Sequence, residues 1–183
     1  MRKEILLSGN GGQGLIMAGV LLGEAAAIYE GKNTTQNQSY GVQARGGECK
    51  SEVIISDDEI NYAEIERPDV LLAMSQSALD TYGLHIKDDT IVIVDSGLVT
   101  DVSVIKNTKN IYMIPITGIS LEKTNKAILA NVVALGVLSA ITGIVKAESL
   151  EKVIRQRAPA GTEEMNLQAL AGGIWAAELL FKQ

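Results

Sequence analysis

The chain has 183 residues, of which 46% are hydrophobic and 21% charged, the mixture of an ordinary globular domain. This composition excludes a disordered chain, a collagen-like repeat and a disulfide scaffold. Lys and Arg number 16 against 22 Asp and Glu, and the net charge of −6 with no basic cluster argues against nucleic-acid binding. Aromatic residues make up only 4%, so we expect a core of Ala, Ile, Leu and Val, as in helix-covered parallel sheets.

The N-terminal segment predicts the opening of a doubly wound α/β fold. An apolar run at 5–8 predicts a strand, and it leads into the glycine-rich stretch Gly9-Asn10-Gly11-Gly12-Gln13-Gly14. Residues 15–29 predict a helix rich in Ala and Leu, which Gly31 ends. A strand, a glycine turn and a helix in this order begin such folds.

The middle of the chain alternates between polar stretches and apolar runs. A polar stretch at 33–45 separates the first helix from a β-branched strand at 51–56, and the acidic segment 57–69 predicts a solvated turn and helix face. Two continuous apolar runs predict central parallel strands, because strands covered on both faces need apolar side chains throughout. These runs are 70–74 and 91–95, with a connecting helix at 76–84 and a further strand at 111–116.

The last third predicts helices. The uncharged run 128–145 is long enough to raise the question of a membrane span. Its polar residues and two glycines favour a helix buried within a domain instead. An amphipathic helix is predicted at 148–157, and helical spacing continues from Leu167 to the C-terminus. We find no linker or repeat, so residues 1–183 are expected to form a single Rossmann-like domain, with a mainly parallel sheet, helices on both faces and a helical C-terminal third.

Cysteine chemistry is limited because Cys49 is alone. One thiol excludes an intrachain disulfide, and it excludes an iron–sulfur cluster or structural zinc site held by thiolates of this chain. A nucleophilic pair of Cys49 with the single histidine, His85, stays open, but a buried Cys in a strand is favoured. The N-terminus enters a strand without the apolar region of a signal peptide, so we expect a cytoplasmic protein.

Gly9, Gly11 and Gly14 match the G-x-G-x-x-G spacing between a strand and a helix. Such a loop permits close backbone approach, and the helix N-terminus favours an anion. Dinucleotide binding also needs a carboxylate about 20 residues further on, whereas 33–38 contains neither an acid nor an Arg. Tight nicotinamide binding is therefore disfavoured. Two interpretations stay open: the glycines bind some phosphate, or they only allow the helix to pack closely on the sheet.

A second motif occupies 38–47, where two glycines directly follow Arg45. Glycines permit positive φ, and a guanidinium so presented is a strong recognition group. An exposed Tyr and Arg in one loop are typical of binding surfaces, although an ordinary solvated loop stays open. Because both motifs follow early strands, we expect them to meet at the carboxyl edge of the sheet.

Seven segments, in order along nearly the whole chain, resemble the γ subunits of the 2-oxoacid:ferredoxin oxidoreductases. They are Gly11–Gly14, Gln38–Gly41, Ala44–Gly47, Val53–Asp57, Arg67–Asp69, Ala130–Gly136 and Pro159–Asn166. The Gln-Ser-Tyr-Gly and Gly-Thr-Glu-Glu sequences most resemble the branch that uses 2-oxoglutarate. Val42-Gln43 departs from the Pro-Glu that is frequent in the family, which indicates a less rigid loop.

The resemblance implies a part in oxidative decarboxylation, in which a 2-oxoacid, coenzyme A and oxidised ferredoxin give acyl-CoA, carbon dioxide and reduced ferredoxin. Thiamine diphosphate, magnesium and the iron–sulfur clusters would belong to α, β and ferredoxin-like δ subunits. The γ chain would carry no catalytic residue and would be inactive alone. The low aromatic content and the apolar, Ala- and Gly-rich helices also indicate surfaces that partners complete, so we expect the isolated chain to self-associate as a dimer or to be poorly soluble. The alternative function is a free-standing Rossmann-type nucleotide-dependent oxidoreductase. The candidate ligand or subunit-interface residues are Gly9, Gly11, Gly12, Gln13, Gly14, Ser39, Tyr40, Gly41, Arg45, Gly46, Gly47 and Asn131.

Overall fold

Apolar runs form the centre of a six-stranded sheet in the computed structural model, which describes residues 1–40 and 47–182. Strands β1, β4, β5 and β6 are parallel, whereas β3 is antiparallel to both of its neighbours, β1 and β2. The predicted α/β class with a mainly parallel sheet is therefore confirmed. In sheet order the strands are β2 (Asn33–Tyr40), β3 (Glu48–Ser56), β1 (Arg2–Asn10), β4 (Val70–Ala73), β5 (Ile91–Asp95) and β6 (Ile111–Ile114).

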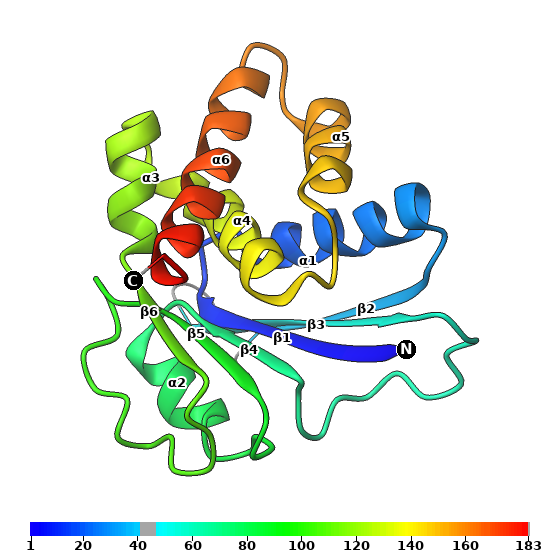
Figure 1. Ribbon diagram of the computed structural model, residues 1–183, viewed down its shortest axis with the longest axis vertical. Helices are drawn as coiled ribbons and strands as arrows, with labels where there is room; N and C mark the ends of the chain where they lie inside the picture. Colours follow the sequence, from blue (N-terminus) through cyan, green and yellow to red (C-terminus); the bar gives the residue numbers. More distant parts are fainter. Residues whose placement is uncertain (41–46, 183) are drawn as a thin grey trace.

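Helices cover both faces of the sheet (Figure 1). Helix α2 lies on one face, and the other five helices of the described residues form a thick layer on the opposite face. Because side chains alternate along a strand, Leu6 and Leu71 face α2 while Ile5 and Leu72 enter the larger core. The helices are α1 (Leu15–Glu24), α2 (Gln76–Tyr82), α3 (Ile116–Thr124), α4 (Ala130–Thr142), α5 (Ala147–Arg157) and α6 (Glu163–Leu180), with short helical turns η1 (Ala25–Tyr29) and η2 (Ala127–Leu129).

Two polar segments differ from their predictions. The first eight residues of the polar stretch 33–45 form β2, because a strand at the sheet edge needs a partner on one side only and tolerates Asn, Gln and Thr. The acidic segment 57–69 contains no helix; it is an irregular and largely exposed connection from β3 to β4. The part of the prediction that made it a helix face was wrong, since this segment lacks an apolar stripe to pack on the core.

The helical C-terminal part begins earlier than predicted. Strand β6 stops at Ile114, and α3 begins directly after Pro115. The sequence analysis extended the strand to residue 116 and did not predict this helix. The predicted buried helix is present as η2 and α4, and it ends where Gly143 adopts a left-handed conformation with φ of 61°. No helix in the part of the chain that the structure describes is long and apolar enough to cross a membrane.

Helices α4 and α6 pack with unusually close backbones. A Cβ atom added at Gly136 would lie 2.2 Å from the carbonyl oxygen of Leu170, and one at Gly173 would lie 2.0 Å from that of Val133. Each helix therefore uses a glycine where the backbone of the other passes. This contact holds α4 at the centre of the helical layer, and α4 carries the candidate residue Asn131 at its N-terminal end.

Candidate functional site

The glycine-rich loop between β1 and α1 is held by the side chain of Gln13. Its Oε1 accepts a hydrogen bond of 2.7 Å from the backbone N–H of Asn10, and its Nε2 donates one of 2.8 Å to the carbonyl of Met74. The amide therefore joins the carboxyl ends of β1 and β4. Gly9 makes room for it, since a Cβ there would lie 2.3 Å from Gln13 Oε1.

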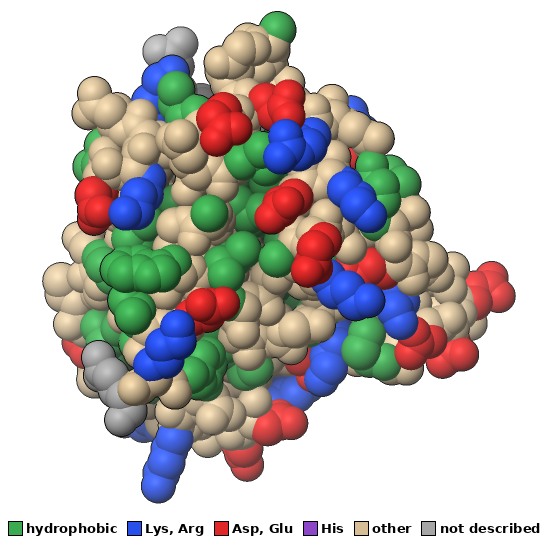
Figure 2. Space-filling view, turned by 45° about the horizontal axis from the view of Figure 1, so that its top comes forward, with side chains coloured by type: hydrophobic (Ala, Val, Ile, Leu, Met, Phe, Trp, Pro, Cys, Tyr) green, Lys and Arg blue, Asp and Glu red, His purple; other side chains and the backbone are tan. Residues whose placement is uncertain are grey.

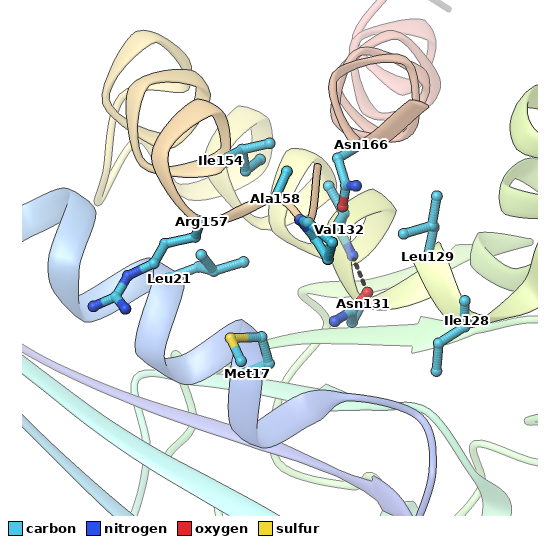
Figure 3. Close-up of a pocket in the computed structure, with 11 residues that line it drawn as sticks. Met17, Leu21, Ile128, Leu129, Asn131, Val132, Ile154, Arg157, Ala158 and Asn166 are labelled. Atoms are coloured by element: carbon cyan, nitrogen blue, oxygen red, sulfur yellow. Dashed lines mark hydrogen bonds between the residues drawn. The ribbon is translucent and has the colours of Figure 1, made fainter. Parts of the chain in front are cut away.

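A second amide clamp comes from α4. The Nδ2 of Asn131 donates a hydrogen bond of 3.1 Å to the carbonyl of Gly14, and its Oδ1 accepts one of 2.9 Å from the N–H of Val132 (Figure 3). Gly14 has a φ of 72°, and a Cβ there would lie 2.6 Å from Asn131 Nδ2. Only 7% of Asn131 is exposed. Two side-chain amides, the half-buried one of Gln13 and the buried one of Asn131, thus fix the loop at both of its ends.

These contacts bear on the alternative of a free-standing nucleotide enzyme. Dinucleotide folds place the pyrophosphate between the carboxyl ends of the central strands, and here the amide of Gln13 spans the ends of β1 and β4. The segment that lacks the ribose carboxylate forms β2, which β3 separates from β1. The geometry therefore favours the interpretation in which the glycines serve close packing.

We accordingly expect no tight binding of NAD or NADP. The Gln13 amide would have to leave two backbone hydrogen bonds to admit a pyrophosphate between β1 and β4. Titration calorimetry of the purified chain should give no isotherm in the micromolar range, which corresponds to about −8 kcal/mol. A micromolar dissociation constant for either dinucleotide would contradict this account of the loop.

The second predicted motif approaches the first. The N–H of Gly11 donates a hydrogen bond of 2.8 Å to the carbonyl of Gly47, and Tyr40 pairs with Cys49 in the β2–β3 ladder. The described ends of the two motifs therefore meet at the carboxyl edge of β1, as predicted, and Ser39 is exposed there. The remaining candidates of this motif, Gly41, Arg45 and Gly46, lie outside the described residues.

A groove of about 220 Å³, which the sequence did not indicate, lies beside Asn131 among α1, α4, α5 and α6 (Figure 3). Hydrophobic side chains gather on this helical face of the molecule (Figure 2), and Met17 and Ile128 are each more than half exposed. The groove is lined by Met17, Leu21, Ile128, Leu129, Asn131, Val132, Ile154, Arg157, Ala158, Pro159 and Asn166. Some of these residues, Asn131 and those in the segment Pro159–Asn166, belong to motifs found in the sequence, although the motifs did not indicate a groove.

The polar residues of the groove are engaged within the chain. Arg157 forms a bidentate ion pair with Glu24 of α1, in which Nε lies 2.9 Å from Oε2. Hydrogen bonding to this carboxylate raises the pKa of the guanidinium. The Nδ2 of Asn166 donates a hydrogen bond of 2.8 Å to the carbonyl of Thr162, one turn earlier. These contacts join α5 to α1 and hold the first turn of α6, so they shape the groove walls.

Cys49 lies in β3 with only 4% exposed, which confirms the buried cysteine expected from the sequence. Its Sγ is 3.5 Å from the carbonyl oxygen of Asn10, and burial raises the pKa of the thiol. A nucleophilic cysteine needs the opposite shift. His85 is exposed beyond α2, so the structure does not support the Cys–His pair. Within residues 1–40 and 47–182, no three His, Cys, Asp or Glu side chains are grouped as a metal site.

Comparison with known proteins identifies the class. A family model described as pyruvate ferredoxin/flavodoxin oxidoreductase matches residues 4–176. The 2-oxoglutarate synthase subunit KorC of Methanocaldococcus jannaschii is 48% identical over 180 residues, which cover 98% of this chain and 96% of that protein.

Two solved structures share the fold over almost their whole length. The γ subunit of keto/oxoacid ferredoxin oxidoreductase from Geobacter sulfurreducens is 42% identical with a TM-score of 0.88, and the match covers 98% of both chains. The pyruvate oxidoreductase subunit PORC from Thermotoga maritima is 30% identical with a TM-score of 0.79, over 96% of both chains.

The chain therefore belongs to the pyruvate ferredoxin/flavodoxin oxidoreductase family. The predicted resemblance is confirmed at the finer level too, since the chain is a γ subunit of the 2-oxoacid:ferredoxin oxidoreductase type. It is thus one part of a multisubunit oxidoreductase.

Proposed function

We propose that the chain is the γ subunit of a 2-oxoglutarate:ferredoxin oxidoreductase that forms succinyl-CoA and carbon dioxide and reduces ferredoxin. The observation that carries this proposal is the gradient of similarity, from 48% identity with a 2-oxoglutarate synthase subunit to 30% with a pyruvate oxidoreductase subunit. Both comparisons cover nearly the whole chain, so the difference does not arise from length.

In this proposal the chain is a non-catalytic partner. Thiamine diphosphate, magnesium and the iron–sulfur clusters reside in the α, β and ferredoxin-like δ subunits, and coenzyme A and ferredoxin serve the assembled enzyme. The engagement of the two candidate side chains Gln13 and Asn131 supports this role, because their amides hold backbone groups of the glycine loop. They fix the shape of a surface and leave the chemistry to other chains.

That surface is the proposed docking site. It consists of the glycine loop at Gly9–Gly14 and the motif from Ser39 to Gly47, which meet through the hydrogen bond between Gly11 and Gly47. We propose that it faces the catalytic subunits and borders the path of coenzyme A, whose phosphates suit the guanidinium of Arg45.

Arg45→Ala is expected to lower the activity of the assembled enzyme, because loss of a hydrogen-bonded charge from such an interface costs about 2–5 kcal/mol. The melting temperature of the isolated chain should change little. Lys106→Ala, on a loop beyond β5, is the matched control and should leave turnover unchanged. If Arg45→Ala instead lowers the melting temperature by several degrees while the complex keeps full turnover and coenzyme A dependence, Arg45 is a structural residue and the docking assignment fails.

Affinity purification from the native host tests the assembly. The tagged chain should bring down α, β and ferredoxin-like δ subunits in fixed proportion. Recovery of the chain without any thiamine diphosphate-binding or iron–sulfur subunit would contradict the proposal. We also propose that the isolated chain self-associates as a dimer, which light scattering over a range of concentrations would measure.

A further inference from the structure

The outer side of β2 offers a free backbone edge. β2 is the last strand on one side of the sheet, and its eight residues pair with β3 in one continuous register. Within the part of the chain that the structure describes, no other backbone group bonds along its outer side. Alternate residues of an antiparallel strand turn their N–H and C=O away from the partner strand, so about half of the residues of β2 present unpaired groups outward.

β2 also lacks the features that usually protect a sheet edge. Such edges are normally short, charged, bulged or interrupted by Pro. The sequence of β2, Asn-Thr-Thr-Gln-Asn-Gln-Ser-Tyr, contains no charged residue and no Pro, and its register has no bulge. The opposite edge is different, since β6 has four residues and lies between Lys109 and Pro115. The fold therefore protects one edge and leaves the longer edge open.

Side-chain hydrogen bonds hold the strand on both of its faces. Gln36 Nε2 donates a hydrogen bond of 2.8 Å to Ser51 Oγ, and Asn37 Nδ2 donates one of 3.0 Å to the carbonyl of Ala63. Neighbouring residues in a strand point to opposite faces, so these two contacts fix β2 from both sides. A strand that is already ordered loses little conformational freedom when another strand pairs with it.

We infer that β2 pairs with β2 of a second copy of this chain, antiparallel about a two-fold axis, to give one continuous sheet through both copies. This inference deepens the self-association proposed above and rests on it. A two-fold axis brings the same edge of each copy together, so the backbone pattern is complementary to itself. The side chains match in charge as well: the chain carries a net charge of −6, but β2 is neutral and brings no like charges together. Thr, Ser, Asn and Gln can also hydrogen-bond across such a pair.

Hydrogen exchange of the full chain at two concentrations tests this interface. Light scattering first identifies a concentration at which the chain is monomeric and one at which it is dimeric. In the dimer, the outward amides of residues 33–40 should exchange at least tenfold more slowly, while those of 111–114 in β6 should not change. Protection confined to another segment would overturn the β2 interface and leave the dimer standing. A chain that stays monomeric at every concentration would overturn both.

Two neighbouring substitutions sharpen the test. Asn37→Pro and Gln38→Pro each remove one N–H, and only one of these two groups points away from β3. One variant should therefore keep a melting temperature near that of the unmodified chain and weaken dimerisation at least tenfold, while the other should mainly lower the melting temperature. Met113→Lys, on the β6 edge, is the control that should leave the dimer intact. If both proline variants dimerise normally, or if β2 is protected only after another subunit is added, the inference fails.

Discussion

Gly173→Ala is expected to lower the free energy of unfolding of the isolated chain by about 3 kcal/mol, the upper part of the usual range for overpacking. The added Cβ would lie 2.0 Å from the carbonyl oxygen of Val133 and 3.1 Å from the N of Val137. Both contacts are backbone atoms of α4, so no side-chain rotation relieves them. The two helices would have to separate, and α4 is buried along most of its length.

The neighbouring glycine supplies a matched control for this prediction. A Cβ at Gly172 would lie 3.1 Å from side-chain atoms of Ile119 and Lys123, which can move. Ala is also favoured over Gly in a helix by about 1 kcal/mol, so Gly172→Ala should be neutral or slightly stabilising. Urea unfolding of both variants measures the difference. Equal effects at the two positions would show that the close α4–α6 contact does not limit stability.

Asn131→Asp is expected to cost about 2–4 kcal/mol of stability at neutral pH, because it buries an unpaired charge. The new carboxylate would face the carbonyl oxygen of Gly14, 3.1 Å from the present Nδ2, and would repel it. Only the hydrogen bond from the N–H of Val132 would remain. The hydrogen bond that holds the glycine loop at Gly14 would thus be lost.

The pH dependence of this variant has a definite sign. We expect burial and the facing carbonyl to outweigh the opposite effect of the first turn of α4, so that the pKa of the new carboxyl in the folded state lies above its unfolded value of about 3.9. The loss of unfolding free energy relative to the unmodified chain is therefore smallest below the unfolded pKa, where a neutral carboxyl can donate to the carbonyl of Gly14. This loss grows as the pH rises toward the folded pKa. Asn107→Asp makes the same change at an exposed position outside any helix or strand and should show no such trend. A loss of unfolding free energy in Asn131→Asp that stays constant between pH 4 and 7 would contradict the proposed burial of the charge.

The apolar strands and buried helices could be predicted because their hydrophobic pattern is local. Residues 70–74 and 91–95 are continuous apolar runs, and they became the adjacent parallel strands β4 and β5. β2 could not be predicted in this way, since its polar residues pair with β3 through the backbone. Likewise, α3 follows β6 with only Pro115 between them, and its short apolar segment resembled a continuation of the strand.

The sequence predicted which motifs form the candidate site, but it did not predict what the individual side chains of these motifs do. The spacing of the glycines indicated a close approach, but it did not show that the amides of Gln13 and Asn131 fill that space. Such contacts join residues 61 and 117 positions apart, and no local pattern encodes them. The groove beside Asn131 likewise combines residues of four helices, so it exists only in the folded chain.

The most direct measurement of the central claim is ferredoxin reduction by the complex reconstituted with and without this chain. With the chain present, the rate should depend on both coenzyme A and 2-oxoglutarate, and 2-oxoglutarate should be preferred over pyruvate. Without it, the rate should fall to the background level while the purified chain alone stays inactive. A complex that keeps full 2-oxoglutarate- and coenzyme A-dependent turnover after the chain is omitted would contradict its assignment as the γ subunit.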